Sequence, residues 1–188
     1  PSVSKSLGVL GLGRNRVVTV PVDDQGRLLP ENLPQPDGPT IVCTQVGNVN
    51  TGACDPVARV CQRVQPAGAW VHVDGAFGLW AAASPAHRHL VEGMAAADSW
   101  ATDAHKWLNV PYDSGVAFVR DGEALRAAMA ITAEYLPPAG AHRSPADYTP
   151  ELSRRGRGVE VWAALRQLGR TGVAELVQRC CGHARRFA

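Results

Sequence analysis

The sequence contains no long uninterrupted hydrophobic run. Its 188 residues are 45% hydrophobic and 19% charged, a composition that favours one folded domain with a packed core over a disordered chain. No apolar stretch reaches the roughly 18 residues that a membrane-spanning helix needs. We therefore expect no membrane partner.

A surplus of charge of either sign is also missing. The chain has 19 Lys and Arg against 17 Asp and Glu, a formal net charge of +2. Such a weak balance argues against nucleic acid and against an acidic surface as partners. Arginines do gather late, in "SRRGRG" and "HARRF", but a basic helix of this kind is more often a solvated face.

Cysteine is present without any pattern that indicates a metal or redox site. No CxxC pair occurs and no Cys/His cluster has zinc spacing. An odd number of cysteines without a signal peptide predicts a reducing, cytoplasmic setting. "LGLG" at 10–13 lacks the GxGxxG spacing of a dinucleotide-binding loop. The five cysteines are Cys43, Cys54, Cys61, Cys180 and Cys181.

The two ends lack the usual features of natural termini. The chain opens on "PSVSKSLGVLGLG" without an initiator Met, and it stops at "HARRFA" inside a helical pattern. We expect it to be a fragment of a longer protein.

Short apolar runs alternate with helical patterns along the chain. The helix over 55–65 is expected to have Asp55 as its N-cap, with Pro56 at the first helical position. Residues 84–95 read as a short helix or loop. Strands that are apolar on both faces and are separated by helices predict a mainly parallel α/β sheet. We expect strands at 16–23, 38–47, 69–78, 98–105 and 114–121, and helices at 55–65, 122–130, 157–169 and 172–188, the last two broken around Gly172.

Two charged residues are expected at one edge of this sheet. Asp74, in "HVDGAFG", ends a hydrophobic strand, and ligands of open α/β sheets bind at the carboxyl ends of strands. Lys106, in "DAHKWL", follows 32 residues later (106 − 74), about one strand–helix–strand excursion. The pair can be a structural salt bridge. It can also hold opposite ends of pyridoxal phosphate, which needs a lysine at its aldehyde and a carboxylate at its ring nitrogen.

Six blocks in order resemble one enzyme family, the group II pyridoxal-phosphate-dependent amino-acid decarboxylases. The resemblance implies the fold type I (aspartate-aminotransferase-like) large domain, an α/β fold with a mainly parallel sheet flanked by helices, here incomplete. It also implies pyridoxal 5'-phosphate as cofactor, an amino acid as substrate and a homodimer as the full-length assembly. The blocks are "SVSKSLGVLGLG", "VPVDDQGRL", "GNVNTGACDP", "WVHVDGAFG", "ADSWATDAHKWLNVPYDSG" and "ELSRRGRGVEVWAALRQLG".

The resemblance implies a role for each matching residue. Lys106 is the lysine that forms the Schiff base, and Asp74 pairs with the pyridine nitrogen. Ala76 packs its methyl group against one face of the ring. His105 lies beside the lysine and reaches the phosphate.

Three further assignments have structural alternatives. Asp103 matches a polar position near the phosphate, and Asn48 faces the side of the ring that carries the phenolic oxygen. Either residue can instead be a turn or capping residue. His72 lies two residues before Asp74 on the same strand face and can orient its carboxylate, or it can be an ordinary core histidine.

The acid that returns a proton to the substrate is expected in the proline-rich segment 132–150, since long loops are often functional lids. Tyr148 is the first candidate and Tyr135 the competing one. We expect residues 1–131 to form part of the cofactor-binding domain and 151–188 to lead toward an absent small domain.

The expected activity is removal of the α-carboxylate of an L-amino acid. Three other reactions of the same cofactor remain open: transamination, carbon–carbon lyase chemistry and oxidative deamination. The family's stacking histidine would directly precede Pro1, and its phosphate-binding loop lies further upstream, so we expect this chain alone to be inactive.

Overall fold

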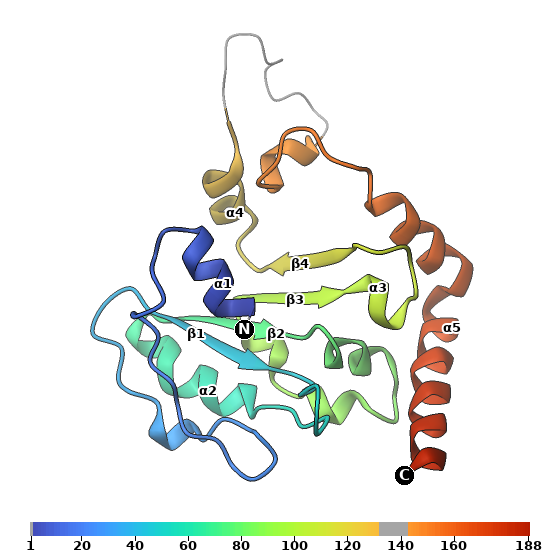
Figure 1. Ribbon diagram of the computed structural model, residues 1–188, viewed down its shortest axis with the longest axis horizontal. Coiled ribbons are helices and arrows are strands. Elements are labelled where there is room, and N and C mark those ends of the chain that lie inside the picture. The colour runs from blue at the N-terminus through green and yellow to red at the C-terminus, as the bar shows by residue number, and fades with distance from the viewer. Residues whose placement is uncertain (1, 132–142) are drawn as a thin grey trace.

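The computed structural model describes residues 2–131 and 143–188, and a four-stranded sheet lies at its centre (Figure 1). Its strand order is β1-β2-β3-β4. The first three strands are parallel and β4 is antiparallel to β3, so the expected α/β fold with a mainly parallel sheet is confirmed. The strands are β1 (Ile41–Gln45), β2 (Trp70–Asp74), β3 (Ser99–Asp103) and β4 (Gly115–Val119).

Helices and short 3-10 turns connect the strands. The α-helices are α1 (Ser2–Val9), α2 (Val57–Val64), α3 (Ala104–Trp107), α4 (Gly122–Met129) and α5 (Gly158–Phe187). The 3-10 turns are η1 (Pro30–Asn32), η2 (Gln65–Ala67), η3 (Gly78–Ala83), η4 (Arg88–Val91), η5 (Met94–Ala96) and η6 (Pro145–Tyr148).

The main core lies between α2 and one face of the sheet. Val60 and Val64 of α2 are fully buried, as are Val71 and Val73 of β2. Side chains alternate across a strand, so the valines of β2 point toward α2 while their neighbours Trp70, His72 and Asp74 point to the other face. We call that other face, lined by Ile41, Cys43, Trp70, His72, Asp74 and Ser99, the open face, because Ile41 is 64% exposed and Cys43 is exposed.

A second, smaller core fixes α5 near the end of the sheet toward which β1 and β3 point (Figure 1). Val173 of α5 is buried with Ala104, Leu108 and Val110, which belong to α3 and the segment after it. This packing holds the short helix α3 in place. It therefore also fixes Lys106, which lies in that helix.

The expected strand at 16–23 is wrong. The only pairing in this stretch is a single bridge between Val22 and Leu28, and Val18 is 69% exposed. The alternation of valines is typical of a strand, but a strand also needs a neighbour to pair with, and the described residues offer none here.

The expected cap of α2 is also wrong. Pro56 is the N-cap and the helix start has no side-chain cap. The Asp55 carboxylate instead accepts the backbone N–H groups of Leu28 (2.7 Å) and Gln45 (2.6 Å). Burial raises the pKa of this carboxyl despite those bonds. Asp55 thus ties the N-terminal segment to the end of β1.

Two element boundaries also differ from expectation. The strand expected over 98–105 ends at Asp103, because α3 begins at Ala104. The C-terminal helices are joined into α5, whose one non-helical residue is Gly169 (φ 61°, ψ −175°) and not Gly172. Only a residue without Cβ adopts that conformation readily. Over the described ranges, no helix combines the length and apolar character that a bilayer span requires.

Candidate active site

The carboxyl ends of three strands are held together by backbone hydrogen bonds. Val46 N–H donates to the Asp74 carbonyl (2.8 Å), and Gly75 N–H donates to the Ala101 carbonyl (2.8 Å). The turns after β1 and β2 also touch: a Cβ on Gly47 would lie 2.6 Å from the Gly78 nitrogen. Asp74 and the segment that carries Lys106 therefore lie at the same edge of the sheet, as predicted.

Lys106 lies on α3, three residues beyond the end of β3. Its Nζ is 2.7 Å from Asp103 Oδ2, and both side chains are a little over a quarter exposed. Nζ also lies 3.9 Å from the centre of the Phe77 ring, a distance at which a cation is attracted to the face of an aromatic ring. The amine is thus held at the sheet edge while staying accessible.

Asp74 is the last residue of β2, and its carboxylate is nearly free of partners. Oδ1 accepts the Ala76 N–H at 3.1 Å. No cationic side chain of the described residues lies within ion-pair distance of it. A half-buried carboxylate usually needs a cationic partner or strong donors. The salt-bridge alternative for Asp74 and Lys106 is therefore not what the structure contains, since Lys106 pairs with Asp103.

Asp103 was expected to lie near the cofactor's phosphate. Its Oδ2 instead pairs with Lys106 and lies 4.0 Å from His105 Nε2. An ionised carboxylate has no proton to donate to a phosphate, so this geometry favours a role toward Lys106. A role toward the phosphate stays a prediction.

His105 is fixed by the segment that leads into β4. The Ser114 N–H donates to His105 Nδ1 at 3.0 Å, and the ring lies against Tyr112 with 4.4 Å between centroids. Nδ1 also lies 3.0 Å from the Ser114 carbonyl oxygen, to which only a protonated Nδ1 could donate, so the two contacts do not select one neutral form of the ring. Nε2, on the other side of the ring, lies 4.0 Å from Asp103 Oδ2.

Asn48 lies in the turn after β1, and its side chain is used within that region. Oδ1 accepts the N–H groups of Asn50 (2.9 Å) and Thr51 (3.3 Å), and Nδ2 donates to Gln45 Oε1 (3.1 Å). These bonds support the turn alternative. Contact with the cofactor's phenolic oxygen stays a prediction.

His72 lies on the open face, next to Asp74 along the strand. Its Nδ1 is 2.8 Å from Ser99 Oγ. Burial lowers the pKa of His72, and the nearby Asp74 charge opposes that shift. The structure thus places an uncharged imidazole beside the Asp74 carboxylate at neutral pH.

Of the two candidate tyrosines, Tyr148 ends η6, which packs beside α4 (Figure 1). Asp147 there pairs with Arg126 of α4 at 3.5 Å, and the Arg143 guanidinium lies 3.9 Å from the centre of the Tyr148 ring. Tyr135 lies outside the described residues. The role of either tyrosine as an acid stays a prediction.

Two residues that support this edge of the sheet, Phe77 and Arg157, were not predicted from the sequence. Phe77 supports Lys106, and its place three residues after Asp74 was the available signal. Arg157 donates to the Asp113 carboxylate (3.0 Å) and carbonyl (3.1 Å), which lowers the pKa of Asp113. The arginine-rich block thus ties the start of α5 to the loop that follows Lys106.

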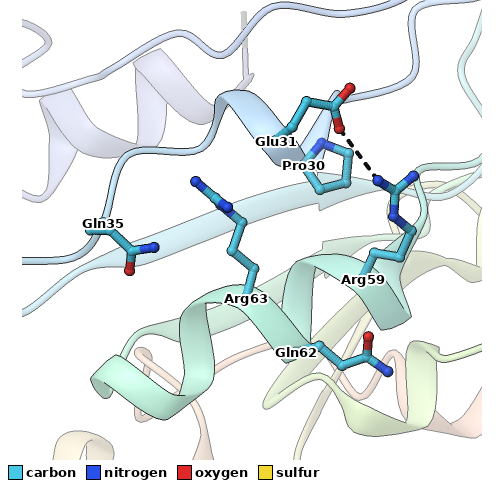
Figure 2. A pocket seen from close by; sticks show the side chains of 6 residues that line it. All are labelled: Pro30, Glu31, Gln35, Arg59, Gln62 and Arg63. Atoms are coloured by element: carbon cyan, nitrogen blue, oxygen red, sulfur yellow. Dashed lines mark hydrogen bonds and ion pairs between the residues drawn. The ribbon is translucent and has the colours of Figure 1, made fainter.

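A shallow surface hollow between η1 and α2 is a separate feature (Figure 2). Its Arg59 pairs with Glu31 at 3.4 Å, and Arg63 donates to the Leu33 carbonyl at 2.8 Å. Both guanidinium groups are therefore already engaged. The hollow contains none of the candidate site residues, and it is lined by Pro30, Glu31, Gln35, Arg59, Gln62 and Arg63.

Comparison with known families identifies the family of this chain. Residues 2–188 match the model of the pyridoxal-dependent decarboxylase conserved domain. The chain belongs to the pyridoxal-dependent decarboxylase family. The cofactor of this family is pyridoxal phosphate, as expected.

Individual decarboxylases of the family match over much of this chain. L-tyrosine/L-DOPA decarboxylase 2 of Lophophora williamsii is 35% identical over 135 residues, which are 70% of this chain and 26% of that protein. Acidic amino acid decarboxylase GADL1 of Bos taurus is 30% identical over 197 residues, 98% of this chain and 38% of that protein. The chain thus spans about a quarter to two fifths of the relatives it matches.

Solved structures of decarboxylases have the same fold. Mouse CSAD superposes with a TM-score of 0.88 at 27% identity, covering 98% of this chain and 40% of that one. Oryza sativa TDC, solved with PLP and tryptamine, gives 0.81 at 28% identity over 91% of this chain and 38% of that one. The expected fold type I domain is confirmed.

The residues at the sheet edge fit pyridoxal phosphate. The ring nitrogen needs an anionic partner, and Asp74 is a carboxylate without a cationic partner among the described residues. The aldehyde needs a primary amine, and Lys106 supplies one at the same edge. Lys106 and Asp74 thus have the chemistry that the two ends of the cofactor require, while the roles of these residues and of Ala76 stay predictions.

Proposed function

We propose that the protein containing this chain is a carboxy-lyase that removes the α-carboxylate of an L-amino acid. The proposal is carried by two residues at one sheet edge: an accessible amine, Lys106, and a carboxylate, Asp74, that has no cationic partner within residues 2–131 and 143–188. Membership of a decarboxylase family supports the same reaction.

Lys106 is the residue that attaches the cofactor. The Asp103 carboxylate at 2.7 Å and the Phe77 ring at 3.9 Å fix the position of Nζ. The amine must lose a proton before it can act as a nucleophile, and a neighbouring carboxylate favours the protonated form of an amine. The role that this contact gives Asp103 is therefore to orient the amine.

Asp74 supplies the negative charge that keeps the ring nitrogen protonated. Bound pyridoxal phosphate supplies a protonated heteroaromatic ring that withdraws electrons from the substrate's α-carbon. The Ala76 N–H fixes one Asp74 oxygen at 3.1 Å, so that the other is free to face the ring. Ala76 itself presents only a methyl group, which lets a flat ring lie close.

Tyr148 is our candidate for the acid whose Oη proton reaches the α-carbon after carbon dioxide leaves, with Tyr135 as the alternative. We infer that His105, Asp103 and Asn48 complete the surroundings of the cofactor. His72 acts one step further away, through Asp74.

We infer that the full protein works as a homodimer. Val159, Trp162 and Leu165 recur every third residue on α5 and are 67%, 65% and 40% exposed, and exposed apolar groups of this kind favour contact with another chain. We also infer a reducing, cytoplasmic setting, because the five cysteines are all unpaired.

A second candidate reaction forms an aldehyde in place of an amine. Phenylacetaldehyde synthase of Petunia hybrida is 29% identical over 153 residues, 79% of this chain and 30% of that protein. The products separate the two reactions: carbon dioxide with an amine supports decarboxylation, whereas an aldehyde supports the alternative.

The test is a product assay on the whole protein loaded with pyridoxal phosphate. The panel contains aromatic amino acids (tyrosine, DOPA, tryptophan) and acidic ones (glutamate, aspartate, cysteine sulfinate). Carbon dioxide is measured as gas, and amines and aldehydes by chromatography. We expect equal amounts of carbon dioxide and amine from one class, and no activity in Lys106→Ala.

The chain offers a matched control, because its only two lysines are Lys5 and Lys106. Lys5→Ala should keep wild-type turnover. Loss of carbon dioxide release in both variants, or in neither, would contradict the role of Lys106. Aldehyde as the main product would favour the alternative reaction.

A further inference from the structure

Three polar side chains form a row on the open face, beside Asp74. Trp70 Nε1 donates to Ser99 Oγ at 2.8 Å, and the same oxygen is 2.8 Å from His72 Nδ1. Trp70 and His72 lie on β2, and Ser99 lies opposite His72 in the register of β3.

The chemistry of the three groups fixes the direction of these bonds. An indole Nε1–H can only donate, so Ser99 Oγ is the acceptor from Trp70. The hydroxyl proton of Ser99 then needs an acceptor of its own, because Ser99 is only 7% exposed and buried hydroxyl groups are nearly always bonded. Within the described part of the chain, the acceptor that lies in reach of it is His72 Nδ1.

His72 Nδ1 therefore accepts, and a neutral imidazole whose Nδ1 accepts carries its proton on Nε2. The surroundings agree with an uncharged ring. Burial lowers the pKa of His72, with Asp74 opposing the shift. Cys43, which faces His72 from β1, is exposed as a residue, but partial desolvation of its sulfur and then the Asp74 charge raise the pKa of its thiol, so it brings no charge at neutral pH.

We propose that Ser99, held by Trp70, is a positioning residue that keeps His72 in its uncharged Nε2–H form beside Asp74. A charged imidazolium on the same strand face would compete for the Asp74 carboxylate. The Trp70–Ser99 pair prevents this and leaves the negative charge of Asp74 to the ring nitrogen of the cofactor. That last step rests on the proposed function.

The direct test is the protonation state of His72 by ¹⁵N NMR of the histidine-labelled whole protein. The His72 signal is the one that disappears in His72→Gln. We expect a protonated Nε2 and an unprotonated Nδ1 at neutral pH, with or without pyridoxal phosphate. A protonated Nδ1 in the wild type would overturn the proposal, and this measurement needs no Ser99 variant.

Two variants test the cause. In Ser99→Ala and in Trp70→Phe we expect the two neutral forms of His72 to mix, whereas Ser99→Thr, which keeps the hydroxyl, should restore the Nε2–H form. An unchanged His72 signal in folded Ser99→Ala would show that Ser99 does not set the tautomer. Circular dichroism establishes which variants fold, and if Ser99→Ala does not, Trp70→Phe supplies the same comparison.

A second measurement tests whether Trp70, Ser99 and His72 together influence Asp74. The absorbance of bound pyridoxal phosphate changes with the protonation of the cofactor, which nearby charges influence, so its pH profile should shift in Ser99→Ala and return in Ser99→Thr. Carbon dioxide release should fall by about tenfold, the size of one lost hydrogen bond. If His72 carries its proton on Nε2 but the protein releases no carbon dioxide, only the proposed function is contradicted. If the protein releases carbon dioxide while His72 carries its proton on Nδ1, only the positioning role of Ser99 is contradicted.

Discussion

The two faces of the central sheet are built from the same strands but differ in what they carry. On one face, Val71 and Val73 are fully buried against α2. On the open face, the residues that alternate with them are Trp70, His72 and Asp74. The two-residue period of a strand thus lets β2 contribute to the core with one set of residues and to the site with the other.

The residues that stabilise this domain and the residues expected to carry its chemistry are therefore largely separate. Each fully buried valine contributes about 1.5–3 kcal/mol through the hydrophobic effect. A polar group on the open face contributes less to stability but decides the charge next to the cofactor. Substitutions on the two faces should therefore have different effects on unfolding and on turnover.

The largest effect on turnover is expected for Asp74→Asn on the open face. The amide keeps the shape and can still accept the Ala76 N–H, but it has no negative charge for the ring nitrogen. We expect carbon dioxide release to fall by about 10²–10³-fold, the usual loss when one preorganised electrostatic group is removed, with little change in unfolding by urea.

Asp24→Asn is the matched control, because Asp24 is exposed and the same chemical change there should leave turnover unaltered. Wild-type turnover in Asp74→Asn would show that the reaction does not need the negative charge of Asp74, and would contradict a catalytic role for the open face.

Val60→Ala on α2 should have the opposite profile. Val60 is fully buried, and loss of two methyl groups from the core costs about 2 kcal/mol of unfolding free energy, measured by urea titration. Turnover per folded molecule should not change. Val18→Ala is the control, since Val18 is 69% exposed, and equal destabilisation by both substitutions would show that the core is not where the structure places it.

The positions of Asp74 and Lys106 were easier to predict from the sequence than the contacts that hold these two residues in place. Asp74 and Lys106 were expected at one edge because parallel strands bring their carboxyl ends together, and the register of β2 and β3 agrees. Both residues follow strands whose apolar runs are easily recognised.

The errors concern contacts between residues that are far apart in the sequence. Asp55 before Pro56 has the pattern of a helix cap, but its carboxylate binds Leu28 and Gln45, which no local pattern reveals. Phe77 beneath Lys106 also depends on how two separate turns meet. The break in α5 falls at Gly169 and not at Gly172, and both glycines lie in the same helical pattern, so the local sequence does not distinguish them.

The smallest expected effect is a pH dependence of the free energy of unfolding, caused by His72 on the open face. Burial lowers the pKa of His72, so between that lowered value and the ordinary value of 6.5 the unfolded chain binds a proton that the folded chain does not. Stability should therefore fall as the pH drops below about 6.5 and should level off once the pH passes below the folded pKa.

Urea titrations from pH 7.5 to pH 5 check this prediction. The fall should be shallower in His72→Gln, which has no titrating group at this position, and the two proteins should differ least in slope above pH 7. The same slope in both proteins across the whole range would mean that His72 is not held uncharged by the fold.

The central claim is that Lys106 attaches pyridoxal phosphate at the edge where Asp74 ends its strand. The most direct measurement is borohydride reduction of the cofactor-loaded whole protein, followed by mass spectrometry of its peptides. This chain has only two lysines to distinguish, Lys5 and Lys106. We expect the reduced cofactor on the peptide that contains Lys106 and none on the peptide that contains Lys5. Label on Lys5, or a Lys106 peptide that remains unmodified while the protein holds the cofactor, would contradict it.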